Sequence, residues 1–281
     1  MIAVCPNPFR DIGMRITQET VLMLNESGHE TAVCPIFAED EPGIIPDGIK
    51  THKLADVAGK CSLIIVIGGD GTILSAARTL HDYSVPILGI NLGTKGFMTE
   101  LEPEDLPLVV RAAEGNMPVS RRMKLDVSLL RGGETVYSDC ALNDAVIHGY
   151  GDCIKLTAMC DGDTITAFSG DGIVLATPTG STGYSMSAGG PIVEPDAENL
   201  IITPICAHVM GSRSFVLDPV RTVSVKTEKL HGRRAYLSVD GNPVYDLAND
   251  DIITVRRSAM YTAMVNMGCK SFYDIAYEKL T

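Results

Sequence analysis

CSLIIVIGGDGTILSAARTL, residues 61–80, joins an apolar run to a glycine-rich turn and then to a segment with helical spacing. The run is apolar from Leu63 to Ile67, which is typical of a strand covered on both faces. A glycine-rich turn between a parallel strand and a helix exposes backbone N–H groups that can bind an anion. The turn has neither the Lys-Ser/Thr pair of a Walker loop nor a third spaced glycine, because position 74 is Leu. It presents Asp70 instead. A plain tight turn is the alternative interpretation, but ligands bind at this end of a parallel sheet, which favours a functional site.

The chain around this turn alternates between strand and helix patterns. Short apolar strands are expected over residues 1–6, 30–37, 61–69 and 85–93. Helices are expected from Ile12 to Leu24, over residues 72–83, and over residues 103–115, where Pro lies near the start and Gly after the end. This alternation predicts a parallel sheet with helices on its faces.

The pattern changes near residue 118, where apolar residues begin to alternate with polar ones. Leu125, Val127 and Leu129 share one face, Gly132-Gly133 forms a hairpin turn, and a second hairpin turns near Asp161-Gly162. The tail is again helix-spaced. The predicted fold class is therefore α/β plus all-β. It combines an N-terminal Rossmann-like parallel-sheet domain, residues 1–118 with about 262–281 returning to it, and a C-terminal β-sandwich domain, residues 119–261.

Composition excludes several classes of function. The chain has 281 residues, 45% of them hydrophobic, and a net charge of -12, so it is not expected to coat nucleic acid, which demands basic surface. The basic cluster of Arg121, Arg122 and Lys124 is interpreted as a solvated edge. The eight cysteines lack metal-binding spacing and indicate reduced thiols. No signal peptide or apolar run long enough to span a membrane is found, so we expect a cytoplasmic protein without a membrane partner. His148 and His208 are interpreted as structural.

Two further segments carry polar groups in positions that suggest binding. "LND", Leu142 to Asp144, interrupts a strand, and an Asn beside a carboxylate can hold a ribose or an amide edge; an edge strand with two solvated residues is an equal alternative. "GDGIVLATPTGSTGYSMSAGGPIVEP", residues 170–195, follows an apolar strand with a loop that has six hydroxyl residues besides Tyr184 between Thr177 and Ser187. This density of donors suits a ligand with many oxygens, and the apolar segments on both sides argue against disorder.

These motifs occur in one order that resembles bacterial NAD kinases. They are "GGDGT", "NLGTKGF", "LND", the long motif of residues 170–195, "PICAH" and "VDGNP". The resemblance covers residues 63–245. The "GGDG" turn is shared with diacylglycerol-type lipid kinases and, loosely, with phosphofructokinases, whereas "TPTGSTGYS" distinguishes NAD kinases from those relatives.

The resemblance implies transfer of the γ-phosphoryl group of ATP to the 2′-hydroxyl of the adenosine ribose of NAD, which forms NADP. It makes Asp70 the proton acceptor, a role worth roughly 10²–10⁴-fold in rate; Asp70 could instead orient the hydroxyl or hold metal. It also implies a set of NAD-binding residues: Asp70, Gly71, Asn143, Asp144, Asp171, Thr182, Gly183, Tyr184, Ser185, Met186, Ser187 and Asn242. Asp171 corresponds to a residue on the nicotinamide side, and residues 182–187 to a loop at the adenine ribose.

The sequence departs from the family pattern at two of these positions. Asp144 replaces the usual Glu and is one methylene shorter, and Gly183 replaces the usual Ala, which should loosen the loop. The resemblance further implies Mg²⁺ or another divalent cation with ATP, and a homodimer or homotetramer, while no resident metal site is expected. Two other classes stay open: a kinase acting on a lipid or small alcohol, against which the loop argues, and a non-catalytic NAD(P) sensor, against which Asp70 argues.

Overall fold

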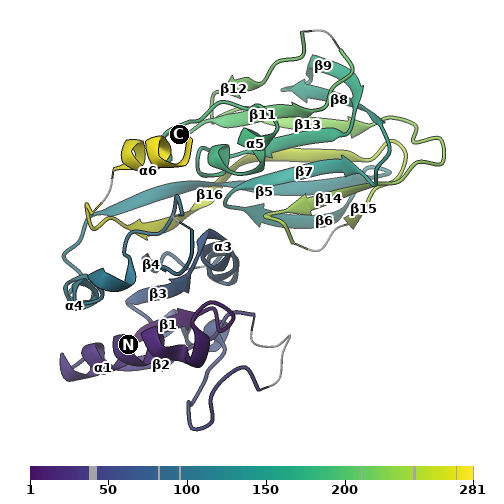
Figure 1. The fold of residues 1–281 in the computed structure, drawn as a ribbon. Coiled ribbons are helices and arrows are strands. Elements are labelled where there is room, and N and C mark those ends of the chain that lie inside the picture. Colours follow the sequence, from purple (N-terminus) through teal and green to yellow (C-terminus); the bar gives the residue numbers. More distant parts are fainter. Residues whose placement is uncertain are drawn as a thin grey trace. The chain divides into compact units, whose positions relative to one another are not determined.

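The computed structural model describes residues 1–37, 43–81, 83–94, 96–209, 211–242, 245–269 and 271–280. The chain divides into two compact units (Figure 1): an α/β unit, Met1–Arg121 with Thr262–Thr281, and a β unit, Arg122–Tyr261. The sequence pattern of apolar and polar residues predicts boundaries between the two domains near residues 118 and 262.

The α/β unit is built on a parallel sheet. Its strands are β1 (Ile2–Pro6), β2 (Thr31–Val33), β3 (Leu63–Gly68), β4 (Ile87–Asn91) and the last residues of β16 (Ile252–Val265). They lie in the order β2-β1-β3-β4-β16, and each pairing is parallel. β1, β3 and β4 are buried along their whole length, as expected of strands with helices on both faces.

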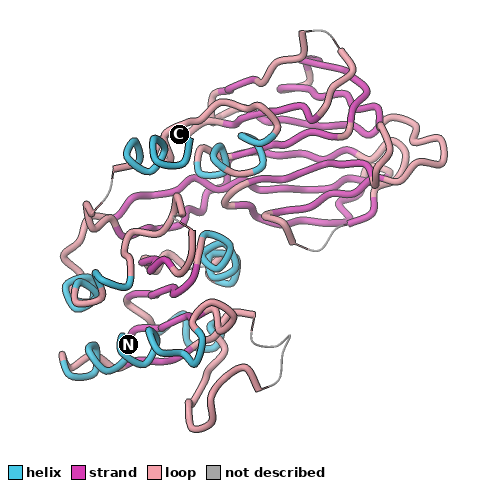
Figure 2. Tube along the Cα trace, in the orientation of Figure 1, coloured by secondary structure: helices cyan, strands magenta, loops and turns pink. Residues whose placement is uncertain are grey.

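Helices cover both faces of this sheet (Figure 2). They are η1 (Ile12–Met14), α1 (Arg15–Glu26), α2 (Leu54–Val57), η3 (Ala58–Lys60), α3 (Asp70–Thr79), η4 (Pro103–Asp105) and α4 (Leu108–Ala113). The unit also includes the C-terminal helix α6 (Phe272–Leu280). The core on one face joins Ile16 and Leu24 of α1 and Val109 of α4 to the strands. The helix predicted over residues 103–115 is split, because Pro107 lacks an N–H group and starts a second helix.

The β unit contains two packed sheets. Its first sheet is formed by β5 (Val119–Arg131), β6 (Glu134–Ala141), β8 (Ile154–Cys160), β9 (Asp163–Gly170), β13 (Thr222–Thr227) and β16. Its second sheet has the order β12 (Phe215–Leu217), β11 (Leu200–Ile205), β10 (Gly172–Ala176), β7 (Asp144–Gly149), β14 (Ala235–Val239) and β15 (Tyr245–Asp246). The second sheet is antiparallel throughout. The predicted fold class, a parallel-sheet domain plus a β-sandwich, is confirmed.

One apolar core joins the inner faces of the two sheets. It takes Leu125 and Val127 from β5, Ile147 from β7 and Leu237 from β14. A smaller cluster on the outer face of the second sheet includes Val174 and Ile201, and Ala188 and Val193 pack on it from the loop after β10. This loop contains η5 (Thr179–Thr182) and α5 (Tyr184–Ser187), so it is folded against the sheet.

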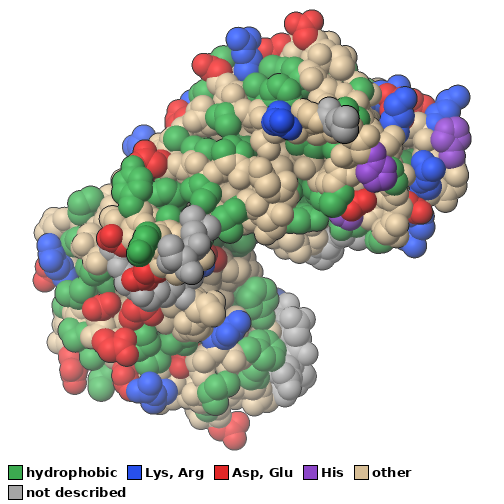
Figure 3. Space-filling view, turned by 45° about the horizontal axis from the view of Figure 1, so that its top comes forward, with side chains coloured by type: hydrophobic (Ala, Val, Ile, Leu, Met, Phe, Trp, Pro, Cys, Tyr) green, Lys and Arg blue, Asp and Glu red, His purple; other side chains and the backbone are tan. Residues whose placement is uncertain are grey.

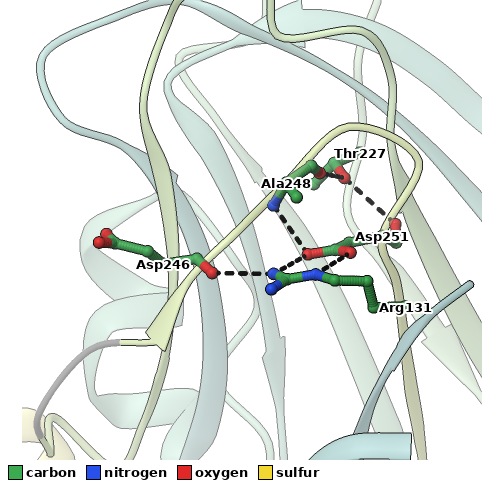
Figure 4. A network of polar contacts seen from close by, with 5 residues as sticks. All are labelled: Arg131, Thr227, Asp246, Ala248 and Asp251. Atoms are coloured by element: carbon green, nitrogen blue, oxygen red, sulfur yellow. Dashed lines mark hydrogen bonds and ion pairs between the residues drawn. The ribbon is translucent and has the colours of Figure 1, made fainter. Parts of the chain in front are cut away.

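An ion pair between a partly exposed arginine and a buried aspartate links three segments of the β unit (Figure 4). Arg131 of β5 forms two bonds with the fully buried carboxylate of Asp251, from Nε to Oδ1 at 2.9 Å and from Nη2 to Oδ2 at 2.7 Å. Asp251 Oδ2 also accepts the N–H of Ala248, and Thr227 Oγ1 donates to the carbonyl oxygens of both. The network ties the turn before β16 to β5 and β13, and a bidentate guanidinium–carboxylate pair is well suited to such a site.

The surface agrees with the acidic composition. Acidic side chains gather on the face of the α/β unit seen in Figure 3, whereas that face of the β unit carries mixed charge. Lys124, however, is only 2% exposed, so its interpretation as part of a solvated basic edge is wrong. Among the described residues, no helix is both long and apolar enough to cross a membrane.

Candidate active site

The glycine-rich turn after β3 places Asp70 at the first residue of α3. Gly69 precedes it in an extended conformation and caps the helix. The Asp70 carboxylate accepts one hydrogen bond on each oxygen, from the backbone N–H of Phe97 at 2.8 Å and of Met98 at 3.1 Å. The two bonds fix the orientation of the carboxylate, and each oxygen keeps acceptor capacity for a further partner.

Two glycines allow this close packing. A Cβ atom at Gly96 would overlap Oδ1 of Asp70, and a Cβ atom at Gly68 would overlap the hydroxyl group of Thr72. Any larger residue at either position would therefore displace a side chain of the turn. The sequence pattern predicts the glycines of the turn, but Gly96 is required by a contact across 26 positions of the chain.

A pocket of about 190 Å³ lies beside Asp70 within the α/β unit. Its described lining comprises Arg10, Gly69, Asp70, Gly71, Leu92, Thr94, Gly96 and Lys279. The first N–H groups of α3 have no acceptor within the helix, and together with the helix dipole they favour an anion. The pocket thus combines anion-binding backbone, two cationic side chains and one carboxylate.

In the β unit, the "LND" segment is held by Asp240 from the turn after β14. The Asp240 carboxylate accepts three successive backbone N–H groups, those of Leu142 at 2.7 Å, Asn143 at 2.7 Å and Asp144 at 3.1 Å. Asp240 itself has a φ of +50°, a left-handed conformation that Asp tolerates better than most residues. The segment is therefore a fixed corner between strands, and the edge-strand alternative for it is wrong.

Two carboxyl groups are buried together at this corner. Burial, and then the charge of Asp240, raise the pKa of Asp144 to about 7. The pKa of Asp240 is also raised by burial, although its three backbone hydrogen bonds and Lys124 oppose the rise. Asp144 is 6% exposed, so its carboxyl group changes charge close to neutral pH.

The hydroxyl-rich loop is anchored to the same corner. Thr177 donates its N–H to the carbonyl oxygen of Asn143 at 2.8 Å, and its hydroxyl donates to that of Leu142 at 2.6 Å. Gly180 packs against Asn143 so closely that a Cβ atom would overlap the Asn143 carbonyl oxygen. The Cβ position of Gly183 faces the side chains of Asn143 and Asp144, at 3.7 Å and 4.0 Å. The structure therefore brings these predicted residues together.

Several polar groups converge on one space beside the loop. The pKa of Tyr184 is raised by burial and then by the charges of Tyr236, Cys206, Asp171 and Asp144. A hydrogen bond with Asp171 raises the pKa of the Cys206 thiol.

Two polar atoms at this end of the β unit are buried without a hydrogen-bond partner in the described structure: Oδ1 of Asn143 and Oγ1 of Thr179. Unpartnered buried polar atoms are costly, which marks these two as groups that a ligand can satisfy.

The remaining predicted residues differ in what they contact. Ser185 is buried and its hydroxyl bonds Thr203 at 3.0 Å, so it holds α5 on β11. Thr182 donates to the Thr179 carbonyl oxygen, and Asn242 Nδ2 donates to the Val239 carbonyl oxygen inside the turn that carries Asp240. Met186 and Ser187 complete the short helix α5. Lys95 and Pro243, which belong to the quoted motifs, lie outside the described residues.

Sequence reasoning missed three residues at these sites: Arg10, Lys279 and Asp240. Asp240 belongs to the quoted motif "VDGNP", but its position in an Asp-Gly turn after an apolar strand does not predict that it holds the "LND" segment. Arg10 and Lys279 come from opposite ends of the chain, and only the tertiary fold brings them to one pocket.

Comparison with known families matches both units of the chain. The model of the ATP-NAD kinase N-terminal domain matches residues 15–113, and that of the ATP-NAD kinase C-terminal domain matches residues 142–267. The NAD kinase of Natranaerobius thermophilus is 35% identical over 100% of this chain and 97% of its own. The chain belongs to the NAD kinase family. The NAD kinase of Ruminiclostridium cellulolyticum is 33% identical over 99% of this chain and 97% of its own.

Solved structures extend the family likeness to the whole fold. A yeast NADH kinase, complexed with NADH, superposes with a TM-score of 0.86 at 27% identity, covering 99% of this chain and 86% of the yeast chain. An NAD kinase from Archaeoglobus fulgidus, in complex with ATP, superposes with a TM-score of 0.76 at 25% identity, covering 100% and 98%. The chain is therefore a phosphotransferase of the NAD kinase family, as its sequence motifs predict.

Proposed function

We propose that this NAD kinase transfers the γ-phosphoryl group of ATP to the 2′-hydroxyl of the adenosine ribose of NAD, forming NADP and ADP. The observation that carries the proposal is the pocket at the start of α3, where a carboxylate on two backbone N–H groups lies beside anion-binding backbone. Such a pocket suits a hydroxyl acceptor and a phosphate donor at once.

Asp70 acts as the proton acceptor in this proposal. The 2′-hydroxyl oxygen attacks the γ-phosphorus, its proton passes to the Asp70 carboxylate, and the bond from the γ-phosphorus to the bridging oxygen breaks to release ADP. The backbone N–H groups of Phe97 and Met98 hold the carboxylate in place without taking up all of its acceptor capacity. Gly71 lines the same pocket, where its lack of a side chain leaves room for the nucleotide.

The β unit holds the dinucleotide. Asn143, with its unpartnered Oδ1, and Asp144 bind the adenosine part, and Thr182 to Ser187 form the loop at the adenine ribose, where Tyr184 contributes a partly exposed side chain. Asp171, whose charge contributes to the raised pKa of Tyr184, contacts the nicotinamide side. Asn242 acts through the turn that orients Asp240, because its amide is bonded there.

The divalent cation enters as part of the Mg–ATP substrate. No group of three or more His, Cys, Asp or Glu side chains among the described residues could hold a metal ion, but the carboxylate of Asp70 lines the phosphate pocket and fits a cation carried by the nucleotide. The cation reduces the negative charge of the phosphates during transfer.

The proposal is tested by incubating the purified protein with ATP, Mg²⁺ and NAD and measuring NADP with an NADP-specific dehydrogenase. NADH in place of NAD tests which form is preferred. We further propose a cytoplasmic homodimer or homotetramer. Free cysteines in the described chain support a reducing compartment, and sedimentation velocity tests the assembly.

A further inference from the structure

Two cationic side chains from opposite ends of the chain, Arg10 and Lys279, line the pocket at Asp70. We propose that Lys279, in the last helix, and Arg10, after the first strand, bind the phosphate oxygens of the ATP donor. This inference rests on the proposed function for the identity of the donor. It assigns to Arg10 and Lys279 the task of holding the transferred phosphoryl group beside Asp70.

Lys279 contacts the side chain of Phe97, the residue whose backbone N–H bonds the Asp70 carboxylate. Its Nζ lies 4.5 Å from the centre of the Phe97 ring, and the backbone N–H of Phe97 donates to Asp70. Phe97 in turn packs on Phe272 of α6, with ring centres 6.2 Å apart. Phe97 therefore contacts the ammonium group through its ring and the carboxylate through its backbone N–H.

The helix that carries Lys279 is itself anchored. Ser271 Oγ donates to Asp274 at 2.7 Å, and the N–H of Asp274 donates back to Ser271 Oγ at 3.1 Å, which caps the first turn of α6. Ile275 is 8% exposed and buries the inner face of the helix. Lys279, four residues further on, lies on the same side as Ile275 and so is directed toward the unit.

Arg10 reaches the pocket from the opposite end of the chain. The loop after β1 is tied to the start of α3, because Asn7 Nδ2 donates to Thr72 Oγ1 at 3.3 Å and the N–H of Arg10 donates to the Asn7 carbonyl oxygen at 3.0 Å. The guanidinium lies against Gly93, whose φ of +137° favours glycine, and a Cβ atom there would be 3.3 Å from Nη1. The loop is therefore tied to the turn, and the guanidinium lies beside it.

Charge balance in the pocket favours an anion as the missing partner. Within the described chain, neither Arg10 nor Lys279 forms an ion pair, although the protein has a net charge of -12. Asp70 is already bonded to two backbone N–H groups. Two unneutralised cations beside anion-binding backbone match a phosphate chain, since phosphoryl transfer depends on positive charge placed around the transferred group.

The test uses Lys279→Met and Arg10→Gln in the full chain, with Lys279→Arg as the conservative variant. Lys60→Met serves as the control, because Lys60 is an exposed lysine of the same unit outside the pocket. Steady-state kinetics give KM for ATP and KM for NAD separately. Calorimetry measures binding of a non-hydrolysable ATP analogue to each protein.

We expect Lys279→Met and Arg10→Gln each to lower kcat/KM for ATP and to weaken binding of the analogue by roughly 10- to 100-fold, as expected for loss of a charged hydrogen bond. KM for NAD should change by less than about 2-fold, and Lys279→Arg should keep most of the affinity, because a guanidinium also binds phosphate. Variants that match Lys60→Met within about 2-fold in both measurements would overturn the inference.

Failure of the proposed function has a different signature. If the wild-type protein makes no NADP, the proposed reaction is wrong, but the calorimetry still decides the phosphate-binding role. Analogue binding that is lost in Lys279→Met and Arg10→Gln supports the inference even then, whereas equal binding by the wild-type protein and both variants overturns it.

Discussion

Replacement of Asp144 by Asn tests the electrostatics of the corner between β6 and β7. The carboxyl group is 6% exposed, and burial and the neighbouring Asp240 raise its pKa from 3.8 to about 7. Asn has nearly the same shape but cannot ionise. The variant therefore removes the charge without emptying the space.

The expected magnitude follows from the pKa difference. The folded state binds the proton more tightly than the unfolded chain, so the stabilisation is fully present below about pH 4 and is lost as pH rises through 7. A difference of about 3 pKa units corresponds to at most about 4 kcal/mol. Relative to Asp144→Asn, the wild-type protein should lose about 2–4 kcal/mol of unfolding free energy between pH 4 and pH 8.

The unfolding free energies of the wild-type protein and Asp144→Asn are measured at each pH by urea unfolding, with tyrosine near-UV circular dichroism as the signal. The chain has no Trp, and six of its nine Tyr residues lie in the β unit, so the signal reports mainly on the unit that contains Asp144. Asp163→Asn, at an exposed position of β9, is the control and should run parallel to the wild-type protein. Curves for the wild-type protein and Asp144→Asn that stay parallel within about 1 kcal/mol from pH 4 to pH 8 would refute the reasoning.

Three further substitutions test the site and the fold. Gly96→Ala should displace the Asp70 carboxylate and lower kcat by roughly 100-fold, because a misplacement of about 1 Å costs that much. Gly183→Ala should stabilise the loop by about 0.4–1 kcal/mol in urea unfolding, since its φ is -96° and the nearest backbone oxygen would lie 3.3 Å from the new methyl. Arg131→Met should cost about 2–4 kcal/mol by leaving the buried Asp251 carboxylate without its cation, discounted because Arg131 is 39% exposed, and should leave kcat unchanged.

Each of these has a contradicting outcome. An alanine at position 96 with wild-type kcat would show that the Asp70 carboxylate is not tightly placed. Lower stability of the alanine variant at position 183 would show that the loop cannot yield by the few tenths of an ångström that the methyl requires. Loss of less than about 0.5 kcal/mol in Arg131→Met would show that Asp251 is held well enough by its backbone bond to Ala248.

Local patterns in the sequence were enough to predict most of the fold. Alternation at Leu125, Val127 and Leu129 depends only on which face is buried, and the structure places all three in the core with the hairpin turn at Gly132-Gly133. The apolar run before the glycine-rich turn predicted β3 because a strand buried on both faces has no polar positions. Pro107 shortened the helix expected over residues 103–115, a backbone effect that apolar spacing does not capture.

The site was harder to predict, because its electrostatics arise from contacts between distant segments. Lys124 looks like a surface lysine beside two arginines, yet the fold buries it, and its charge opposes the rise that burial causes in the pKa of Asp240. Asp240 itself bonds residues almost a hundred positions earlier in the chain. Lys279 meets Phe97 only after the C-terminal helix has docked on the α/β unit. None of these contacts leaves a periodic signal in the sequence.

NADP formation by the wild-type protein and by Asp70→Asn tests the central proposal most directly. Asn keeps the size of the side chain, but its one amide oxygen can accept only one of the two N–H groups of Phe97 and Met98, and it cannot take up the proton of the ribose hydroxyl. With NAD, ATP and Mg²⁺, we predict NADP from the wild-type protein and a kcat at least about 100-fold lower for Asp70→Asn. Absence of NADP with the wild-type protein, or an Asp70→Asn variant as fast as the wild type, would contradict the account.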